Sequence, residues 1–383
     1  MSPVVMELAL LAPLVPLASA GLALMNSGLS RSRSAAHAML APLCVTAVAV
    51  LVYCVCGFRL QETVPLPVTG ELEWLQMFCV ALAAIIPLGG GGERWRLGAA
   101  CASTAILAGL TYPLFAHWAW SGGWLARMGF RDAGGSSTIQ AVGGLTALAM
   151  ARLLGPRRGK YDSEGVPAAF PGHSAVLVLF GCFLTWVGWI GLNLAGSLLF
   201  ALDMDKNIPA IPINTTLSAA AGLLAAAALT RARFGRPDAS LCANGWTSGL
   251  VASSAACAWM APAAAISVGA VAGLLVTLCV ELLDVRLHID DPAGSVSVHA
   301  AGGTWGVVAV AIFGPAKWSA QLAGIGALLI VILPMTFALN WLLNRFYPQR
   351  IPPDGEPEGL DLFELGAGAY PEFVIRRDDF RPR

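Results

Sequence analysis

Two polar side chains with hydrogen-bonding nitrogens, Gln140 and His299, occupy the same place in a motif that the sequence contains twice. Each stands eight residues after an aspartate, Asp132 in the first copy and Asp291 in the second, and each is followed three residues later by Gly-Gly. Both copies open a long apolar stretch. Many transporters build a site near the middle of the membrane from matched residues of an internal repeat. We therefore expect Gln140 and His299 to lie at matching depths of two matching helices.

The chemistry of these two side chains differs. An ionisable residue inside an apolar span is a functional candidate by default, and neutral imidazole both donates and accepts a hydrogen bond. His299 could thus line a path for a small polar molecule, or be a neutral histidine that a packed neighbour satisfies. Gln140 does not titrate near neutral pH, which excludes a proton relay along two imidazoles. Gln140 is expected either to contact the solute or only to bond His299 and fix its tautomer.

Trp120 and the two aspartates are further candidates. Trp120 lies in an aromatic segment, 112–123, where its ring could attract a partly dehydrated cation or belong to an interfacial aromatic belt. Asp132 and Asp291 each precede an apolar run, a position typical of helix N-caps. Capping is favoured for Asp291, whereas Asp132 could instead shape an external vestibule for cations.

The composition sets the class of protein that must position these residues. The chain has 383 residues, of which 57% are hydrophobic and 12% charged, about half the charged share of a soluble domain. It is therefore expected to be an all-α integral membrane protein in a lipid bilayer. A net charge of zero gives no reason to expect a nucleic-acid partner. The nine cysteines lack metal-type spacing, so no metal, cofactor or disulfide framework is expected, and no residue is predicted to be catalytic.

Apolar segments of roughly twenty residues, the length of a membrane helix, recur along the chain. The first is expected to be a membrane helix, with a cleaved signal peptide as the alternative. Eleven helices are predicted, at residues 5–27, 36–57, 73–92, 97–118, 133–155, 172–200, 212–231, 241–260, 262–284, 293–314 and 318–345.

The alternating loops differ in basic residues. One side of the predicted bundle collects eleven Lys and Arg residues and the other side five. Positive residues mark the cytoplasmic side, so the amino terminus is predicted outside, in the inner (plasma) membrane. Two parts follow from this: a membrane domain, 1–347, and a cytoplasmic tail, 348–383.

Ordered landmarks along nearly the whole chain resemble those of the ammonium transporter family, which includes Amt proteins, methylammonium permeases and Rhesus proteins. The landmarks are short motifs that follow one another in the family's order: 21–28, Gly92-Glu93-Arg94, 117–123 with 132–135, 188–193, Pro237-Asp238 with Asn244-Gly245, Asp290 to Pro292 with Val298-His299, and 359–361 with Tyr370. The resemblance implies a homotrimer of eleven-helix protomers with a five-plus-five inverted repeat, as in an Amt-type channel. It also implies that ammonium is recruited at an external aromatic site and that ammonia crosses a hydrophobic pore.

The family's site residues carry over residue by residue. The resemblance implies that Trp120 and Ser197 receive ammonium beside Asp132, and that His299 is the second pore histidine. Gln140 stands where the first pore histidine is expected. The gating phenylalanine of the third helix falls at Cys79, next to Phe78, and its partner on the sixth helix falls at Leu192.

The tail departs from the family as well, because Leu365-Gly-Ala367 replaces its His-Gly-Glu motif. This change weakens the case for a PII-type regulator as partner. Two functions therefore stay open. The chain is expected to be an ammonium transporter or channel; the alternative is an ammonium sensor that conducts little or nothing and acts through its tail on a fused signalling domain.

Overall fold

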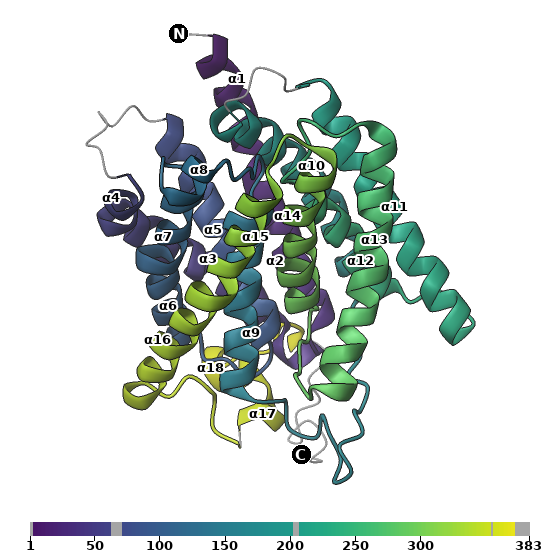
Figure 1. Cartoon of the computed structure of the whole chain (residues 1–383). Helices are drawn as coiled ribbons and strands as arrows, with labels where there is room; N and C mark the ends of the chain where they lie inside the picture. Colours follow the sequence, from purple (N-terminus) through teal and green to yellow (C-terminus); the bar gives the residue numbers. More distant parts are fainter. Residues whose placement is uncertain (1–2, 63–70, 202–206, 354, 372–383) are drawn as a thin grey trace, which may run out of the picture.

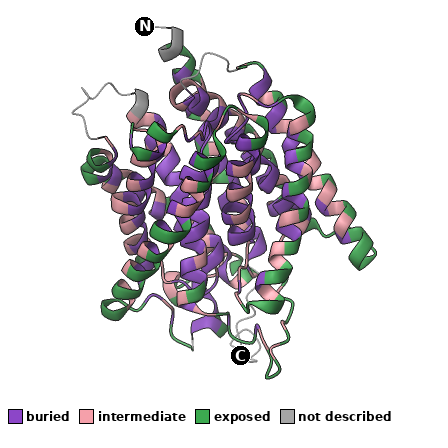
Figure 2. Ribbon diagram, in the orientation of Figure 1, coloured by how far each residue is buried: buried purple, intermediate pink, exposed green. Residues whose placement is uncertain are grey.

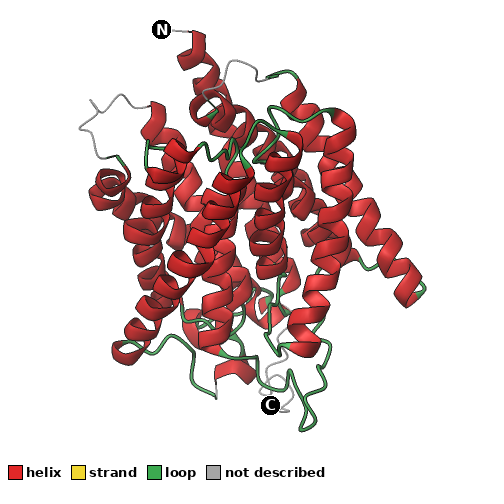
Figure 3. Cartoon of the chain, viewed as in Figure 1, coloured by secondary structure: helices red, strands yellow, loops and turns green. Residues whose placement is uncertain are grey.

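A computed structural model describes residues 3–62, 71–201, 207–353 and 355–371, and within these ranges every regular element is helical (Figure 3). In the same ranges, ten helical segments are long and apolar enough to cross a membrane. They stand side by side in one bundle (Figure 1). Their helices are α1 (Pro3–Leu11) with α2 (Val15–Leu29), α3 (Ala35–Val52) with α4 (Phe58–Gln61), α5 (Glu71–Gly91), α6 (Leu97–Ile106) with α7 (Tyr112–Ala119) and α8 (Trp124–Met128), α9 (Val142–Leu154), α10 (Ala175–Phe200), α11 (Ala210–Phe234), α13 (Pro262–Glu281), α14 (Gly302–Phe313), and α15 (Trp318–Ala327) with α16 (Leu333–Phe346).

The eighth helix of the eleven-helix bundle is α12 (Ala239–Ser253), which packs against both α11 and α13 but is shorter than the other crossings. The sequence predicted helix 241–260, yet the helix ends seven residues earlier. Turns follow the helix, and their backbone carbonyls accept hydrogen bonds from another segment. The Ser254 carbonyl accepts from Gly134 N–H and the Ala255 carbonyl from Ala133 N–H. Non-helical backbone inside a membrane protein is stable where protein groups satisfy it in this way. The all-helical, eleven-helix fold is otherwise as predicted.

The two copies of the repeated motif begin the fifth and the tenth crossing. Each opens with a six-residue π-helical turn, η5 (Ser136–Ala141) before α9 and η7 (Val296–Ala301) before α14. Successive crossings alternate in direction, and the two copies lie five crossings apart, which is an odd number. The two copies therefore enter the membrane from opposite sides. They meet in the middle, since η7 packs on α9 and η5 packs on α14. The fold therefore contains the inverted repeat that the resemblance implied.

The outer surface of the bundle is rich in apolar side chains, as its core is, which is unusual for a soluble protein. Buried residues run along the central helices, and exposed residues gather on the outer faces (Figure 2). Many exposed residues are large and apolar, such as Val176, Phe180 and Phe183 of α10. Contiguous apolar surface of this kind is stable against lipid or another subunit. This observation agrees with the membrane class that the composition indicated.

Candidate functional site

Gln140 and His299 are in contact at the centre of the bundle. His299 Nδ1 lies 2.8 Å from Gln140 Oε1, and the two residues are 3% and 0% exposed. Because an amide oxygen only accepts, Nδ1 carries the proton and Nε2 is left as an acceptor. The amide nitrogen of Gln140 is buried and has no protein partner within the described part of the chain. The pair thus presents one unsatisfied donor and one acceptor to a small polar molecule.

Two glycines hold the pair at this distance. A Cβ atom on Gly144 would lie 2.7 Å from the carbonyl carbon of His299, and one on Gly303 would lie 3.0 Å from the amide nitrogen of Ala141. Each glycine therefore lets its helix press directly on the π-helical turn of the other copy. Small residues allow such close approach between membrane helices. The second glycine of each Gly-Gly pair has this packing role.

The aspartates of the two motifs cap their own helices in matching fashion. One oxygen of Asp132 accepts from the backbone N–H groups of Ser137 at 3.0 Å and Thr138 at 2.9 Å. One oxygen of Asp291 accepts from Val296 N–H at 2.8 Å, again five residues further on. In both cases the second oxygen is buried and has no protein partner among the described residues. The capping role predicted for Asp291 thus also applies to Asp132.

The enclosure of the two carboxyl groups changes their acidity. Burial raises the pKa of Asp132, against the hydrogen bonds from Ser137 and Thr138, which lower it. Burial likewise raises the pKa of Asp291 to about 6, although the backbone N–H groups of Val296 and Ser297 lower it. Loss of water around a carboxylate disfavours its charged form. Asp291 therefore changes charge within reach of physiological pH.

The predicted recruitment residues lie near Asp132. Trp120 Nε1–H donates to the backbone oxygen of Asp132 at 2.8 Å, which fixes the indole beside the first motif. Ser197 is buried on α10, and its Oγ lies 3.5 Å from Cys257 Sγ. Phe200, one turn further along α10, stacks on the Trp120 ring with centroids 3.9 Å apart and planes 4° from parallel. The sequence reasoning missed Phe200; its position one helical turn after Ser197 was the available signal.

Two of the residues at the expected gate, Cys79 and Leu192, are buried in the core. The ring of Phe78 is partly buried, and its centroid lies 5.8 Å from that of Trp74. Among the described residues, the ring that stacks on Trp120 is that of Phe200 in α10.

A buried ion-pair network, which the sequence analysis did not anticipate, ties the two halves together near the second motif. Asp290 accepts a hydrogen bond from Arg157 Nε at 2.9 Å, and Glu93 accepts one from Arg157 Nη1 at 2.7 Å. Arg31 completes the network through its own bond to Glu93. Burial alone would raise the pKa of Asp290, but the Arg94 and Arg157 guanidiniums outweigh it and lower the pKa to about 2. Glu93, Arg94 and Asp290 of this network belonged to landmark motifs, but no sequence pattern indicated that Arg31 and Arg157 would join them.

The tail docks on the same face through acidic side chains. Asp361 in α18 (Leu360–Leu365) accepts from the backbone of Ala36 at 3.0 Å and of His37 at 2.7 Å, at the start of α3. Glu364 Oε2 lies 2.8 Å from both His37 Nε2 and Leu97 N, the first residue of α6. Helix N-termini attract carboxylates because their N–H groups are unpaired and the dipole is positive. The tail is thus held although it lacks the family's His-Gly-Glu motif.

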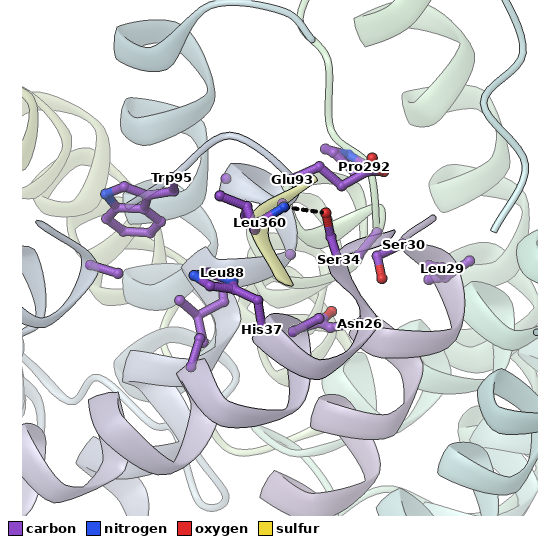
Figure 4. A pocket seen from close by; sticks show the side chains of 17 residues that line it. Asn26, Leu29, Ser30, Ser34, His37, Leu88, Glu93, Trp95, Pro292 and Leu360 are labelled. Carbon is purple, nitrogen blue, oxygen red and sulfur yellow. Dashed lines mark hydrogen bonds between the residues drawn. The ribbon is translucent and has the colours of Figure 1, made fainter. Parts of the chain in front are cut away.

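A small cavity of about 40 Å³ lies between this tail and the second motif, and its lining includes Leu360, Ser34, His37, Asn26 and Pro292 (Figure 4). The backbone N–H of Leu360 donates to Ser34 Oγ at 3.2 Å. The volume suits one or two water-sized molecules. The tail therefore forms one wall of a cavity that adjoins the start of the His299 helix.

An inverted repeat of membrane helices with a matched polar pair at its centre defines a class: membrane proteins that handle a small polar solute. Comparison with known proteins gives the family. The model of the Ammonium Transporter Family matches residues 6–370. The chain belongs to this family, as the ordered landmarks predicted.

Individual relatives agree with this assignment. The chain is 35% identical to ammonium transporter Amt2 of Archaeoglobus fulgidus, over 94% of this chain and 86% of the relative, and 30% identical to ammonium transporter 3 of Dictyostelium discoideum, over 94% and 92%. These relatives are named as ammonium transporters, which agrees with the prediction that the chain belongs to a family of transporters and not of enzymes.

Solved structures share the fold. A structure named Sensor Amt Protein superposes with a TM-score of 0.86 at 28% identity and covers 94% of this chain and 98% of its own. Candida albicans Mep2 superposes with a TM-score of 0.82 at 24% identity, over 92% and 87%, a likeness that concerns the fold alone. The all-helical Amt-type fold is thereby confirmed.

Proposed function

We propose that this protein recruits ammonium at an external site around Trp120, Ser197 and Asp132 and passes ammonia between Gln140 and His299. The observation that carries the proposal is the contact between Gln140 Oε1 and His299 Nδ1 at 2.8 Å. The fixed tautomer leaves an acceptor on His299 and a donor on Gln140, and neutral ammonia can satisfy both groups. Ammonium has no lone pair for the amide donor, so the pair favours the neutral form.

The charge of the transported ion is lost on the outer side in this scheme. Trp120 offers an aromatic face and Asp132 a carboxylate oxygen that has no protein partner among the described residues. A cation held there gives up one proton to water on the outer side, and the ammonia that remains enters the apolar pore. Gln140 does not titrate, so the proton does not follow ammonia across the pair by a relay of two imidazoles.

Ammonium jumps on proteoliposomes test this function, with the internal pH as the readout, because entry of neutral ammonia raises the internal pH and carries no current. We expect a rise in internal pH that His299→Ala reduces strongly, because that substitution removes the acceptor and leaves the Gln140 amide without its partner. Uptake of labelled methylammonium with and without an imposed membrane potential separates neutral from charged transport, since only charged transport depends on the potential. Binding of ammonium without current or uptake would overturn the transporter proposal.

The second candidate function is ammonium sensing, and two observations favour it. The tail docks on the N-termini of α3 and α6 and walls the cavity beside the second motif. The fold is also shared with a structure named Sensor Amt Protein. In this version, occupancy of the pore changes the position of the tail, which acts on a signalling domain or regulator. Ammonium-dependent tail movement in a protein that shows neither current nor uptake would support it.

Assembly and orientation are further parts of the proposal. The exposed apolar faces of the bundle fit a homotrimer in the plasma membrane, with the amino terminus outside and the tail, 348–383, in the cytoplasm. Native mass spectrometry in detergent measures the number of subunits. Tags placed at either end, probed in intact and opened cells, test the orientation.

A further inference from the structure

The Trp120 ring is the part of the external site that attracts a cation, and one of its faces is covered. Phe200 stacks on it with centroids 3.9 Å apart and planes 4° from parallel. A cation interacts with an aromatic ring when it lies over the face, within about 6 Å of the centroid. Two rings in van der Waals contact leave no space for an ion between them. On this face the site is therefore closed.

The Trp120 ring cannot turn away easily to uncover this face. Its Nε1–H donates to the Asp132 backbone oxygen at 2.8 Å, and its own backbone N–H bonds Ala116 at 2.8 Å at the end of α7. Phe200 is the last residue of α10, and its ring is partly buried against the core, as that of Trp120 is. The phenyl ring makes no hydrogen bond, whereas the indole of Trp120 would lose its bond to Asp132 if it moved. Of the two rings, Phe200 is therefore the one that can be displaced without breaking a hydrogen bond.

The geometry of the stack also makes it replaceable. Aromatic pairs prefer offset or edge-to-face arrangements with centroids 4.5–7 Å apart over a full face-to-face overlap. The Trp120–Phe200 pair is nearly parallel with a shorter separation, so its quadrupoles oppose each other. A cation over the Trp120 face is electrostatically favourable by contrast. Exchange of the Phe200 ring for a small cation is thus an exchange of a weak partner for a better one.

We infer that Phe200 is a specificity-determining residue that competes with the cation for the face of Trp120, so that ammonium binds there only when the Phe200 ring swings out. This inference rests on the proposed function, in which Trp120 receives ammonium. A small cation needs a small displacement of the ring, whereas a bulky alkylammonium needs a large one. Phe200 therefore sets both the apparent affinity and the size preference of the external site.

Substitution of Phe200 by leucine removes the ring and keeps an apolar side chain. We expect Phe200→Leu to lower the ammonium concentration that gives half-maximal response by roughly twofold, the fold-change that corresponds to an aromatic pair at the weak end of the usual range, about 0.5 kcal/mol. The response to methylammonium should gain more than the response to ammonium. Phe183→Leu, on the same helix but 62% exposed, is the matched control and should change neither value.

The outcomes separate this inference from the proposed function. If Trp120→Leu abolishes the response but Phe200→Leu leaves the half-maximal concentration unchanged or raises it, Phe200 does not compete and the inference is wrong, while the proposed function stands. If Trp120→Leu has no effect, the proposed recruitment site itself is wrong. Phe200→Trp restores a large ring at the end of α10 and should return the half-maximal concentration to the wild-type value or above it. Equal shifts for Phe200→Trp and Phe200→Leu would also overturn the inference.

Discussion

Gln140 and His299 come from halves of the chain that enter the membrane from opposite sides, and they meet in a hydrogen bond of 2.8 Å between Oε1 and Nδ1. The bond fixes the imidazole tautomer, with its proton on Nδ1. Because the Gln140 amide does not titrate near neutral pH, His299 is the one titrating group of the pair. Under the proposed function the pair suits a neutral solute, and each half of the chain supplies one of its two polar groups.

Gln140→His should move the protein toward proton-coupled transport. Two imidazoles in contact can exchange a proton, whereas an amide and an imidazole cannot. We expect larger ammonium-evoked currents from the Gln140→His variant in proteoliposomes. Gln140→Asn is the control, because it keeps the amide but withdraws it from His299 by one methylene. Unchanged currents in Gln140→His would show that the limiting element lies elsewhere, with Cys79 and Leu192 as the residues to test next.

Gly144→Ala and Gly303→Ala should each destabilise the protein by about 1–3 kcal/mol, the range for overpacking a well-packed core. The new Cβ at Gly144 would lie 2.7 Å from the His299 carbonyl carbon, so the two pore helices must separate. Thermal unfolding in detergent measures the loss, and transport should fall with it. Gly326→Ala on α15, where no atom lies within 4 Å of the added Cβ, should have little effect. Equal stability of all three variants would contradict the packing role of the motif glycines.

The sequence predicted this central site better than its surroundings, for a physical reason. Helix positions and the paired motif follow from apolar length and from an internal repeat with a fixed spacing of Asp, polar side chain and Gly-Gly, both of which are local patterns. Phe200 and the Arg157 network depend on which side chains meet after distant helices pack, and no local pattern carries that information. The end of α12 was misplaced for the same reason, since Ser254 and Ala255 leave the helix to bond Gly134 and Ala133.

Asp291 predicts a pH dependence of stability with a definite sign. Its pKa is about 6 in the folded protein, above the ordinary aspartate value of about 3.9. Between these two pH values the unfolded chain ionises first, so the contribution of Asp291 to folding stability declines as pH rises from about 4 to 6 and then stays low. Asp291→Asn keeps an oxygen to cap Val296 N–H but removes the titration.

The measurement is the difference in unfolding temperature between Asp291→Asn and the wild type across pH 4–8. We expect this difference to grow in favour of the variant as pH rises to about 6 and to level off above it. Glu164→Gln, in an exposed loop of the same face, controls for loss of one surface charge. A difference that stays constant or shrinks with rising pH would show that the Asp291 carboxyl is not shifted in this direction.

Comparison of Leu360→Ala with Leu362→Ala tests whether the tail docks through its buried leucine, which lines the cavity, or through its exposed surface. Leu360 is 1% exposed and walls the cavity beside the second motif, whereas Leu362, in the same short helix, is 54% exposed. Truncation of a buried leucine costs about 2–5 kcal/mol, and truncation of an exposed one changes little. The Leu360→Ala tail should therefore leave its site far more often.

Trypsin cleavage at Arg350, whose guanidinium is held by the Leu154 and Pro156 carbonyls in the docked state, reports this opening. Faster cleavage in Leu360→Ala alone supports docking through the cavity wall, and equal rates in the two variants argue against it. If ammonium slows or speeds the same cleavage in the wild type, then pore occupancy and tail position are linked, as the sensing function requires.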